Sequence, residues 1–98
     1  MIICFIRTIQ IHFNPGTEIR FDIHEYSCVK IIVWKVLGQK VRTVVEAYLD
    51  PGRKSVKWEG RDEQGNPGGS GGYCYTMYAR SLDDGRECTM TRKSILMK

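Results

Sequence analysis

The histidines and carboxylates are the side chains of this sequence best suited to acid–base chemistry, and their positions do not favour an enzyme. The two histidines are His12 and His24, and nucleophilic catalysis needs a base within hydrogen-bond reach of the nucleophile. We expect no strand-to-helix elbow of the kind that presents a catalytic serine. Glu18 and Asp22 share one face of a predicted strand, but four residues span about 13 Å, too far for a carboxylate pair. The sequence therefore predicts a non-catalytic chain with His24 on the solvated surface.

Cysteine thiols are the second candidate for chemistry. The four cysteines stand far apart and form no C-x-x-C pair, so their spacing supports neither a zinc ribbon nor a thioredoxin-type site. Four cysteines allow three disulfide pairings, and the sequence does not choose among them. A cysteine also packs as a small apolar residue without any bridge. We predict free thiols and no bound metal for these residues, which are Cys4, Cys28, Cys74 and Cys88.

The segment 60–72 is rich in glycine and carries no recognisable ligand motif. Asp62–Asn66 is rich in oxygen ligands, but it lacks the D-x-D-x-D-G order and the distal glutamate of a calcium loop. No phosphate-binding G-K-[ST] or G-x-G-x-x-G stands between a strand and a helix. We predict a long surface loop with a turn at Asp62–Asn66, and no cofactor.

Five aromatic side chains offer the surface of a carbohydrate platform, in which rings stack on sugars. Large aromatics also dominate the burial energy of small cores. We favour core packing for most of them and keep a glycan site as the alternative. The five are Trp34, Trp58, Tyr73, Tyr75 and Tyr78.

Length and charge limit the classes of protein. The chain has 98 residues, enough for one small domain. Its net charge is +4, but the basic residues are spread along the chain and form no nucleic-acid footprint. The apolar run Met1–Ile6 is far shorter than the roughly 20 residues of a membrane helix. It also lacks the basic segment and cleavage site of a signal peptide. We predict no nucleic-acid partner and no membrane span.

The elements that must position these residues are short strands. Glu18–His24 alternates strictly, with Ile19, Phe21 and Ile23 on one face. Val29–Trp34 is rich in β-branched residues and predicts a central strand. Further strands are predicted at 41–45, 54–58, 73–79 and 87–97, with turns at 37–40, 50–52 and 83–85. The pattern predicts an all-β protein, an antiparallel sandwich of about seven strands.

Motifs in order along the chain resemble the FlgD-like immunoglobulin domain family. The C-terminal tail is also similar to the R-K-M-x-L-L-K tail of type IX secretion sorting domains. The matching motifs are Phe13-Asn14-Pro15-Gly16-Thr17, Val36-Leu37-Gly38-Gln39, Trp58-x-Gly60-Arg61-Asp62-x-x-Gly65, Ser70-Gly71-x-Tyr73-x-Tyr75 and Arg92-Lys93-Ser94-Ile95-Leu96-Met97-Lys98.

The resemblance implies an immunoglobulin-like sandwich at the C-terminal end of a larger secreted bacterial protein. Such a module serves sorting or surface attachment, and its partners are secretion or cell-surface machinery and the N-terminal passenger domains. The alternative is a structural spacer or a protein- or glycan-binding sandwich, including a flagellar hook-cap scaffold. By resemblance, the positions that carry recognition are Gly71, Tyr73, Lys93 and Lys98.

The chain departs from the family pattern in three places. Positions 68, 69 and 72 are glycine where the family has small or branched apolar residues, and Cys74 replaces the usual Phe. We therefore expect thinner packing near the loop. Ser94 replaces an apolar residue of the tail, which weakens the resemblance to the sorting group.

The N-terminal departure bears on the domain boundaries. The family has a Tyr-x-Asn-Pro-Phe lead-in, and a shifted reading frame through Ile9–Phe13 would encode it. We therefore predict a domain over 13–98 preceded by an atypical extension, 1–12, that is an out-of-frame start. The alternative is a genuine strand built on Ile9, Ile11 and Phe13.

Overall fold

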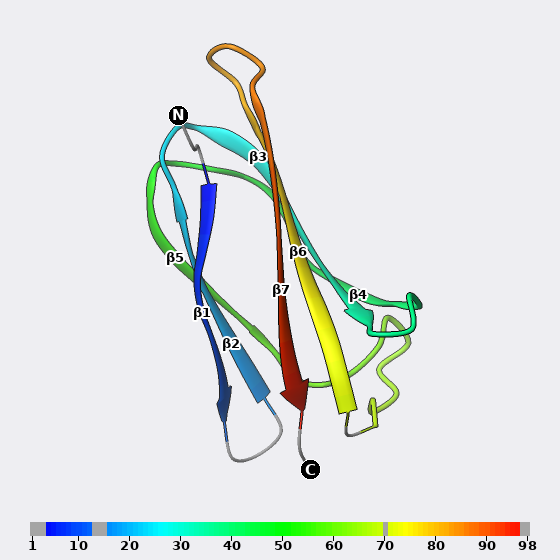
Figure 1. The fold of residues 1–98 in the computed structure, drawn as a ribbon. Helices are drawn as coiled ribbons and strands as arrows, with labels where there is room; N and C mark the ends of the chain where they lie inside the picture. The colour runs from blue at the N-terminus through cyan, green and yellow to red at the C-terminus, as the bar shows by residue number, and fades with distance from the viewer. Residues whose placement is uncertain (1–3, 13–15, 70, 97–98) are drawn as a thin grey trace.

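The structure is a computed structural model and describes residues 4–12, 16–69 and 71–96 (Figure 1). These residues contain seven strands and no helix. Their bounds are β1 (Cys4–His12), β2 (Gly16–Ile23), β3 (Ser27–Lys35), β4 (Lys40–Leu49), β5 (Gly52–Trp58), β6 (Gly71–Ser81) and β7 (Glu87–Leu96).

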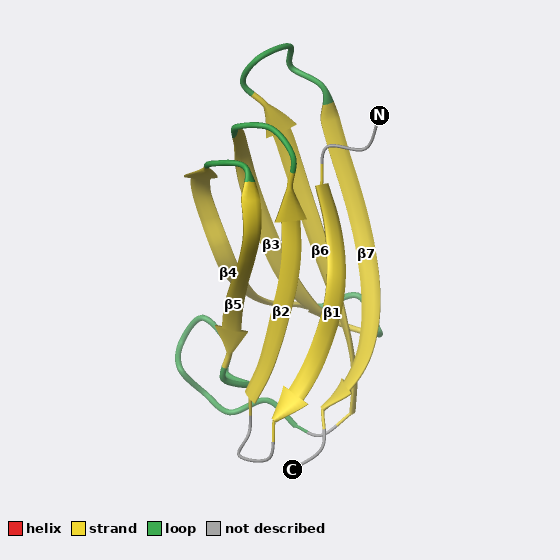
Figure 2. Cartoon of the chain, turned by 90° about the vertical axis from the view of Figure 1, so that its left-hand side faces the viewer, coloured by secondary structure: helices red, strands yellow, loops and turns green. Residues whose placement is uncertain are grey.

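The strands form two antiparallel sheets packed face to face (Figure 2). The smaller sheet has the order β1-β2-β5 and the larger one β4-β3-β6-β7. An immunoglobulin constant domain divides its seven strands in the same way, except that its fourth strand lies beside the fifth. Here the fourth strand pairs with the third. The predicted immunoglobulin-like β-sandwich is confirmed.

The core lies between the two sheets and is built by the alternation seen in the sequence. Every second residue of β2 points inward, and β3 occupies the predicted central position, flanked by β4 and β6. Burying such aliphatic and aromatic side chains stabilises the fold by roughly 1.5–3 kcal/mol each. The inward-facing residues of these two strands are Ile19, Phe21, Ile23, Val29, Ile31 and Val33.

Strand β1 is part of the sandwich. It pairs with β2 from Cys4 to His12, and the side chains of Cys4 and Ile6 are fully buried. Residues Cys4–His12 thus form a strand, with Ile9 packed against the core; Phe13 lies outside the described residues. The reading-frame hypothesis, and with it the boundary at residue 13, stays a prediction that sequencing of the locus tests.

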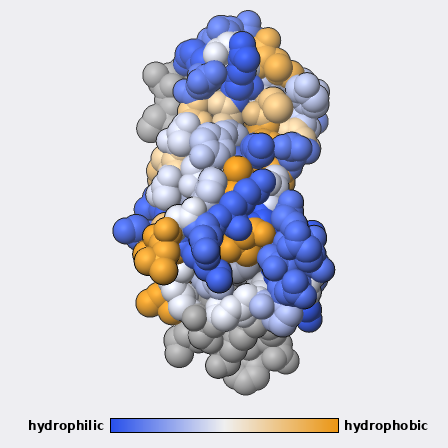
Figure 3. All heavy atoms as spheres, turned by 90° about the vertical axis from the view of Figure 1, so that its right-hand side faces the viewer, coloured by the Kyte–Doolittle hydropathy of each residue, from blue (hydrophilic) through white to orange (hydrophobic). Residues whose placement is uncertain are grey.

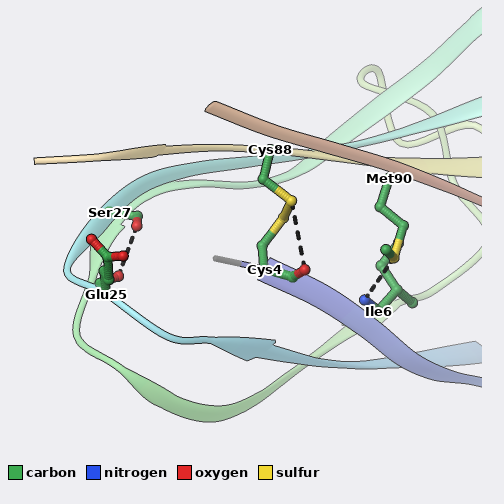
Figure 4. The surroundings of a disulfide bond; sticks show 6 residues. All are labelled: Cys4, Ile6, Glu25, Ser27, Cys88 and Met90. Atoms are coloured by element: carbon green, nitrogen blue, oxygen red, sulfur yellow. Dashed lines mark hydrogen bonds between the residues drawn. A yellow bond between two sulfur atoms is a disulfide. The ribbon is translucent and has the colours of Figure 1, made fainter. Parts of the chain in front are cut away.

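A disulfide joins Cys4 on β1 to Cys88 on β7 (Figure 4). The prediction of free thiols is wrong for this pair and correct for Cys28 and Cys74. The physical reason is that β1 and β7 are edge strands of different sheets that lie side by side. This arrangement brings the two Cα atoms to 6.1 Å across 84 positions of sequence, a proximity that spacing alone does not reveal.

Two further contacts close the same side of the sandwich. The backbone N–H of Ile6 on β1 donates to the thioether sulfur of Met90 on β7 at 3.3 Å, as Figure 4 shows. The guanidinium of Arg92 lies 5.5 Å from the ring centroid of Phe5, within cation–π range. These contacts and the disulfide join the edge strands β1 and β7 on one side of the sandwich. The edge strands on the other side are β4 and β5.

A polar network holds the end of the sandwich where β6 and β7 are joined. Glu25 accepts hydrogen bonds from the Ser81 hydroxyl at 2.8 Å and from the guanidinium of Arg86. Arg86 also bonds Asp84, and its backbone N–H lowers the pKa of that carboxyl. The predicted hairpin turn is confirmed, with Gly85 at a φ of 75° that favours glycine.

The molecule is elongated, with extents of 41 × 23 × 20 Å. β1 begins toward the end that carries the β6–β7 hairpin, whereas β7 ends at the opposite end (Figure 1). Among the described residues, no helix is long and apolar enough to cross a membrane.

Candidate functional site

Two glycines at the start of β6 lie between the β3–β4 turn and the end of β7. Gly71 and Gly72 pair with Leu96 and Ile95 of β7. On their other side, the backbone N–H of Val36 donates to the carbonyl of Gly72 at 3.2 Å. This end of the larger sheet thus unites three segments that are far apart in sequence and that all belong to motifs of the resemblance.

Exposed apolar side chains surround these glycines. Leu37 is 93 % exposed, Ile95 61 % and Val36 54 %. A hollow of about 250 Å³ lies between the β3–β4 turn and the start of β6. Figure 3 shows hydrophobic atoms among hydrophilic ones in the lower half of this side of the molecule. We call Val36, Leu37, Gly71, Gly72 and Ile95 the Gly72 surface.

Leu37 is presented by an ordered turn. The N–H of Lys35 donates to the carbonyl of Gln39, and the N–H of Gly38 to the carbonyl of Lys35, both at 2.8 Å. Gly38 has a φ of 101°, which L-residues with a side chain rarely adopt. An apolar side chain held in this way loses little further conformational freedom when a partner covers it.

Lysines flank the Gly72 surface. Lys93, one of the predicted recognition residues, is exposed on β7 and pairs with Cys74 of β6. Lys35 and Lys40 are exposed at the end of β3 and the start of β4. Lys98, also predicted for recognition, lies outside the described residues. The structure therefore places Gly71 and Lys93 on or beside one surface that is apolar at its centre and basic around it.

Tyr73, the remaining predicted recognition residue, points inward. Its side chain is buried, and its hydroxyl donates to the carbonyl of Gly69 at 2.6 Å. The ring packs edge-on against Trp58 at a centroid distance of 5.0 Å. Burial raises the pKa of the phenol. Tyr73 can act on the Gly72 surface only indirectly, by fixing the loop that precedes β6.

Two of the glycines that depart from the family pattern, Gly68 and Gly72, have little room for a side chain. A Cβ on Gly68 would lie 2.8 Å from the Tyr73 hydroxyl oxygen and 3.1 Å from the carbonyl oxygen of Gly60. A Cβ on Gly72 would lie 2.6 Å from Cγ2 of Val36. At these two positions, neighbouring atoms fill the space that a side chain would occupy.

The loop before β6 contains the predicted turn. The carboxylate of Asp62 accepts the N–H groups of Gln64 at 3.0 Å and Asn66 at 2.9 Å, and its carbonyl accepts the N–H of Gly65. Arg42 on β4 donates to the same carbonyl at 2.9 Å, which ties the loop to the larger sheet. In the part of the chain that the structure describes, no three His, Cys, Asp or Glu side chains are grouped as metal ligands.

The run 68–72 also has the letters of the G-x-S-x-G elbow of serine hydrolases, which sequence reasoning missed. In that elbow the serine stands between a strand and a helix, close to a histidine. Here the segment that starts at Gly71 is the strand β6 and not a helix; Ser70 itself lies outside the described residues. His24 is exposed directly after β2, as predicted.

The aromatic residues divide into core and surface. Trp58, Tyr73 and Tyr75 are buried and pack against one another, as predicted. Trp34 is half-buried and Tyr78 exposed on the outer face of the larger sheet. Tyr48, 64 % exposed on β4, was not singled out from the sequence, because it lies beyond the strand predicted at 41–45.

Removal of the Tyr73 hydroxyl should weaken the fold. Tyr73→Phe deletes the hydrogen bond to Gly69, so we expect the free energy of unfolding to fall by about 1 kcal/mol in urea denaturation. Tyr78→Phe is the matched control, because Tyr78 is an exposed tyrosine on the same strand, β6. Its effect should stay within about 0.5 kcal/mol. Equal losses in the two variants would contradict this assignment.

Comparisons of the chain with protein-family models, with curated proteins and with solved structures give no match. The fold alone therefore defines the class, an immunoglobulin-like β-sandwich with the Gly72 surface at one end. The resemblance to FlgD-like and type IX sorting domains stays a prediction.

Proposed function

We propose that this chain is a non-catalytic sorting or surface-attachment module at the C-terminal end of a larger secreted bacterial protein. Its partner is a protein of the secretion or cell-surface machinery. The observation that carries the proposal is the Gly72 surface, with Leu37 93 % exposed on an ordered turn. Exposed apolar residues with a polar rim are typical of a protein-interaction site.

The disulfide supports an exported location. Disulfides persist in oxidising compartments such as the bacterial periplasm and the cell exterior, and they are rare in the cytosol. Cys4–Cys88 joins the first strand of the fold, β1, to the last, β7. A protein that is secreted or held at the cell surface, after passage through the periplasm, would keep this bond.

Reporter secretion tests the proposal. Residues 1–98 are fused to the C-terminus of a periplasmic reporter in a bacterium with type IX secretion, and reporter activity is measured outside the cell and in the periplasm. The fusion includes β1 because Cys4 and Ile6 belong to the core. We expect the reporter outside the cell. Retention in the periplasm would contradict the sorting role.

A charge at the centre of the Gly72 surface should abolish sorting. For Leu37→Asp we expect at least about a tenfold loss of exported reporter, because a carboxylate in an apolar interface stays desolvated and unpaired. Stability should change by less than about 0.5 kcal/mol, since the side chain is exposed. Leu82→Asp, at an exposed leucine of the β6–β7 hairpin, is the matched control and should be exported normally. Normal export of Leu37→Asp would exclude the Gly72 surface as the recognition site.

The alternative is a spacer or a protein- or glycan-binding sandwich, including a flagellar hook-cap scaffold. Exposed Tyr48 and Tyr78 on the outer face of the larger sheet favour the glycan version, because tyrosine rings stack on apolar sugar faces. A fusion that stays in the periplasm but binds immobilised glycans, with binding lost in Tyr48→Ala, would favour this function over sorting.

A further inference from the structure

The end of the larger sheet opposite the Gly72 surface also exposes apolar side chains. The last paired row of β4, β3 and β6 at that end consists of Leu49, Ser27 and Ser81. The residues one position beyond this row are Asp50, Tyr26 and Leu82. The backbone N–H of Leu82 donates to the carbonyl of Tyr26 at 2.9 Å, and both side chains are exposed. We call Tyr26, Asp50 and the hairpin residues 82–84 the Leu82 surface.

The connections at this end are acidic. They comprise residues 24–26, 50–51 and 82–86, and their four carboxylates and one guanidinium belong to Glu25, Asp50, Asp83, Asp84 and Arg86. The adjoining residues of β6 and β7 add no net charge, because Arg80 lies opposite Glu87. With histidine counted as neutral, the connections carry an excess of three negative charges around the apolar side chains of the Leu82 surface.

The Gly72 surface has basic side chains around its apolar residues. Trp34 of β3 lies opposite Lys40 of β4, and Cys74 of β6 lies opposite Lys93 of β7. Lysines therefore stand in both edge strands of the larger sheet, and Lys35 lies at the end of β3 between them. These three lysines form no ion pair with any described residue.

The neighbouring loop does not cancel this basic charge. The three carboxylates and one guanidinium of residues 59–69 belong to Glu59, Asp62, Glu63 and Arg61. A second guanidinium, that of Arg42, donates to the carbonyl of Asp62. Together with the three lysines, five cations stand against three carboxylates, which leaves an excess of two positive charges at this end.

We propose that copies of this chain associate head to tail, with the Leu82 surface of one copy on the Gly72 surface of the next. Contact between the two surfaces removes exposed apolar side chains from water. The opposite charges around them attract and orient the copies, whereas contact between two equal ends would place like charges together. A second copy of the chain is therefore the occupant that the charges favour.

The two surfaces belong to opposite ends of the same strands, so the contact does not close on itself. The hairpin and the start of β6 lie at opposite ends of the molecule (Figure 1). The 11 residues of β6 separate them by about 36 Å of extended chain. Each bound copy keeps a free surface on which a further copy can bind. Such heterologous interfaces generate open chains unless a rotation closes them into a ring.

The size of the contact makes the association weak. The two shorter extents of the molecule are 23 and 20 Å. One end therefore offers roughly 460 Å², and two ends together roughly 900 Å², whereas stable specific interfaces bury about 1,200–2,000 Å². We expect self-association at concentrations of about 0.1–1 mM.

Sedimentation velocity over a concentration series tests the proposal. For residues 1–98 we expect the weight-average mass to rise steadily between about 0.02 mM and about 1 mM, with no plateau at the dimer. Raising NaCl from about 0.05 M to about 0.5 M should weaken the association at least about threefold, because salt screens the exposed charges. A chain that stays monomeric up to about 1 mM, or an association that does not respond to salt, would overturn the proposal.

Two complementary variants identify the surfaces. Leu37→Asp alters the Gly72 surface and Leu82→Asp the Leu82 surface, and each places a carboxylate that stays desolvated and unpaired in an apolar contact. Each variant alone should associate at least about tenfold more weakly than the wild type. An equimolar mixture should form a heterodimer and stop there, because one intact surface of each kind remains. Ser55→Asp, exposed in the middle of β5, is the control and should associate like the wild type.

The mixture separates head-to-tail contact from other modes of association. Leu82→Asp that still forms dimers would indicate pairing of two Gly72 surfaces and would overturn the proposal. So would a mixture without heterodimer, provided that both variants keep the urea midpoint of the wild type. The proposal shares the Gly72 surface with the sorting contact but does not depend on sorting. Leu82→Asp should lose self-association and keep normal export, so failure of either idea is recognised separately.

Discussion

Loss of the Cys4–Cys88 disulfide should lower the free energy of unfolding by about 4 kcal/mol, since the bond closes a loop across 84 positions of sequence. The double variant Cys4→Ala/Cys88→Ala should show this loss in urea denaturation. A small domain has a free energy of unfolding of only about 5–15 kcal/mol. We therefore expect the variant to be partly unfolded near 37 °C.

Reduction provides an independent measure of the same bond. Dithiothreitol should move the wild-type midpoint to that of the double variant and should leave the variant unchanged. Cys28→Ala/Cys74→Ala is the matched control, because these cysteines are free and half-buried; we expect a loss below about 2 kcal/mol. A wild-type midpoint that does not respond to reductant would show that the bond does not stabilise the fold.

Truncation of Trp58 should have an effect of similar size. Trp58→Ala removes the largest buried side chain, its edge-on packing against Tyr73 and Tyr75, and the indole hydrogen bond to the carbonyl of Arg61 at 2.9 Å. We expect the free energy of unfolding to fall by about 3–5 kcal/mol. Far-UV circular dichroism in urea measures the loss without relying on tryptophan fluorescence.

The other tryptophan provides the comparison. Trp34 is half-buried on the outer face of the larger sheet, so Trp34→Ala should cost less than about 2 kcal/mol. Similar losses for Trp34→Ala and Trp58→Ala would mean that the inner aromatic cluster is not the main packing unit at this end of the sandwich.

Local patterning was sufficient to predict most of the fold. In β2, alternation of apolar and polar residues placed Ile19, Phe21 and Ile23 in the core, and in β3 the β-branched run marked the central strand. These are properties of a strand and its two faces, which a sequence contains directly. The turns at Gly38 and Gly85 were equally local, since both positions need a positive φ.

Contacts between sheets were not predictable in the same way. The disulfide depends on which edges of the two sheets meet, and this is decided by the packing of the whole sandwich. The Gly72 surface was found only in part. The resemblance pointed to Gly71 and Lys93, but the exposure of Leu37 and Ile95 follows from three strand ends meeting in space. Tyr73, which the resemblance gave as a recognition residue, is buried, and its hydroxyl is used inside the loop.

The position of the disulfide has a mechanical consequence. β1 and β7 run in the same direction (Figure 1). The disulfide between Cys4 and Cys88 joins these two strands near their starts. Tension applied between a passenger before Cys4 and an attachment beyond β7 would enter the fold through a covalent bond and continue along β7 alone. Residues 5–87 lie inside the closed loop and would carry none of the extension. Under load, the oxidised domain can lengthen only by peeling β7 from β6, whereas the reduced domain can unravel along its whole length.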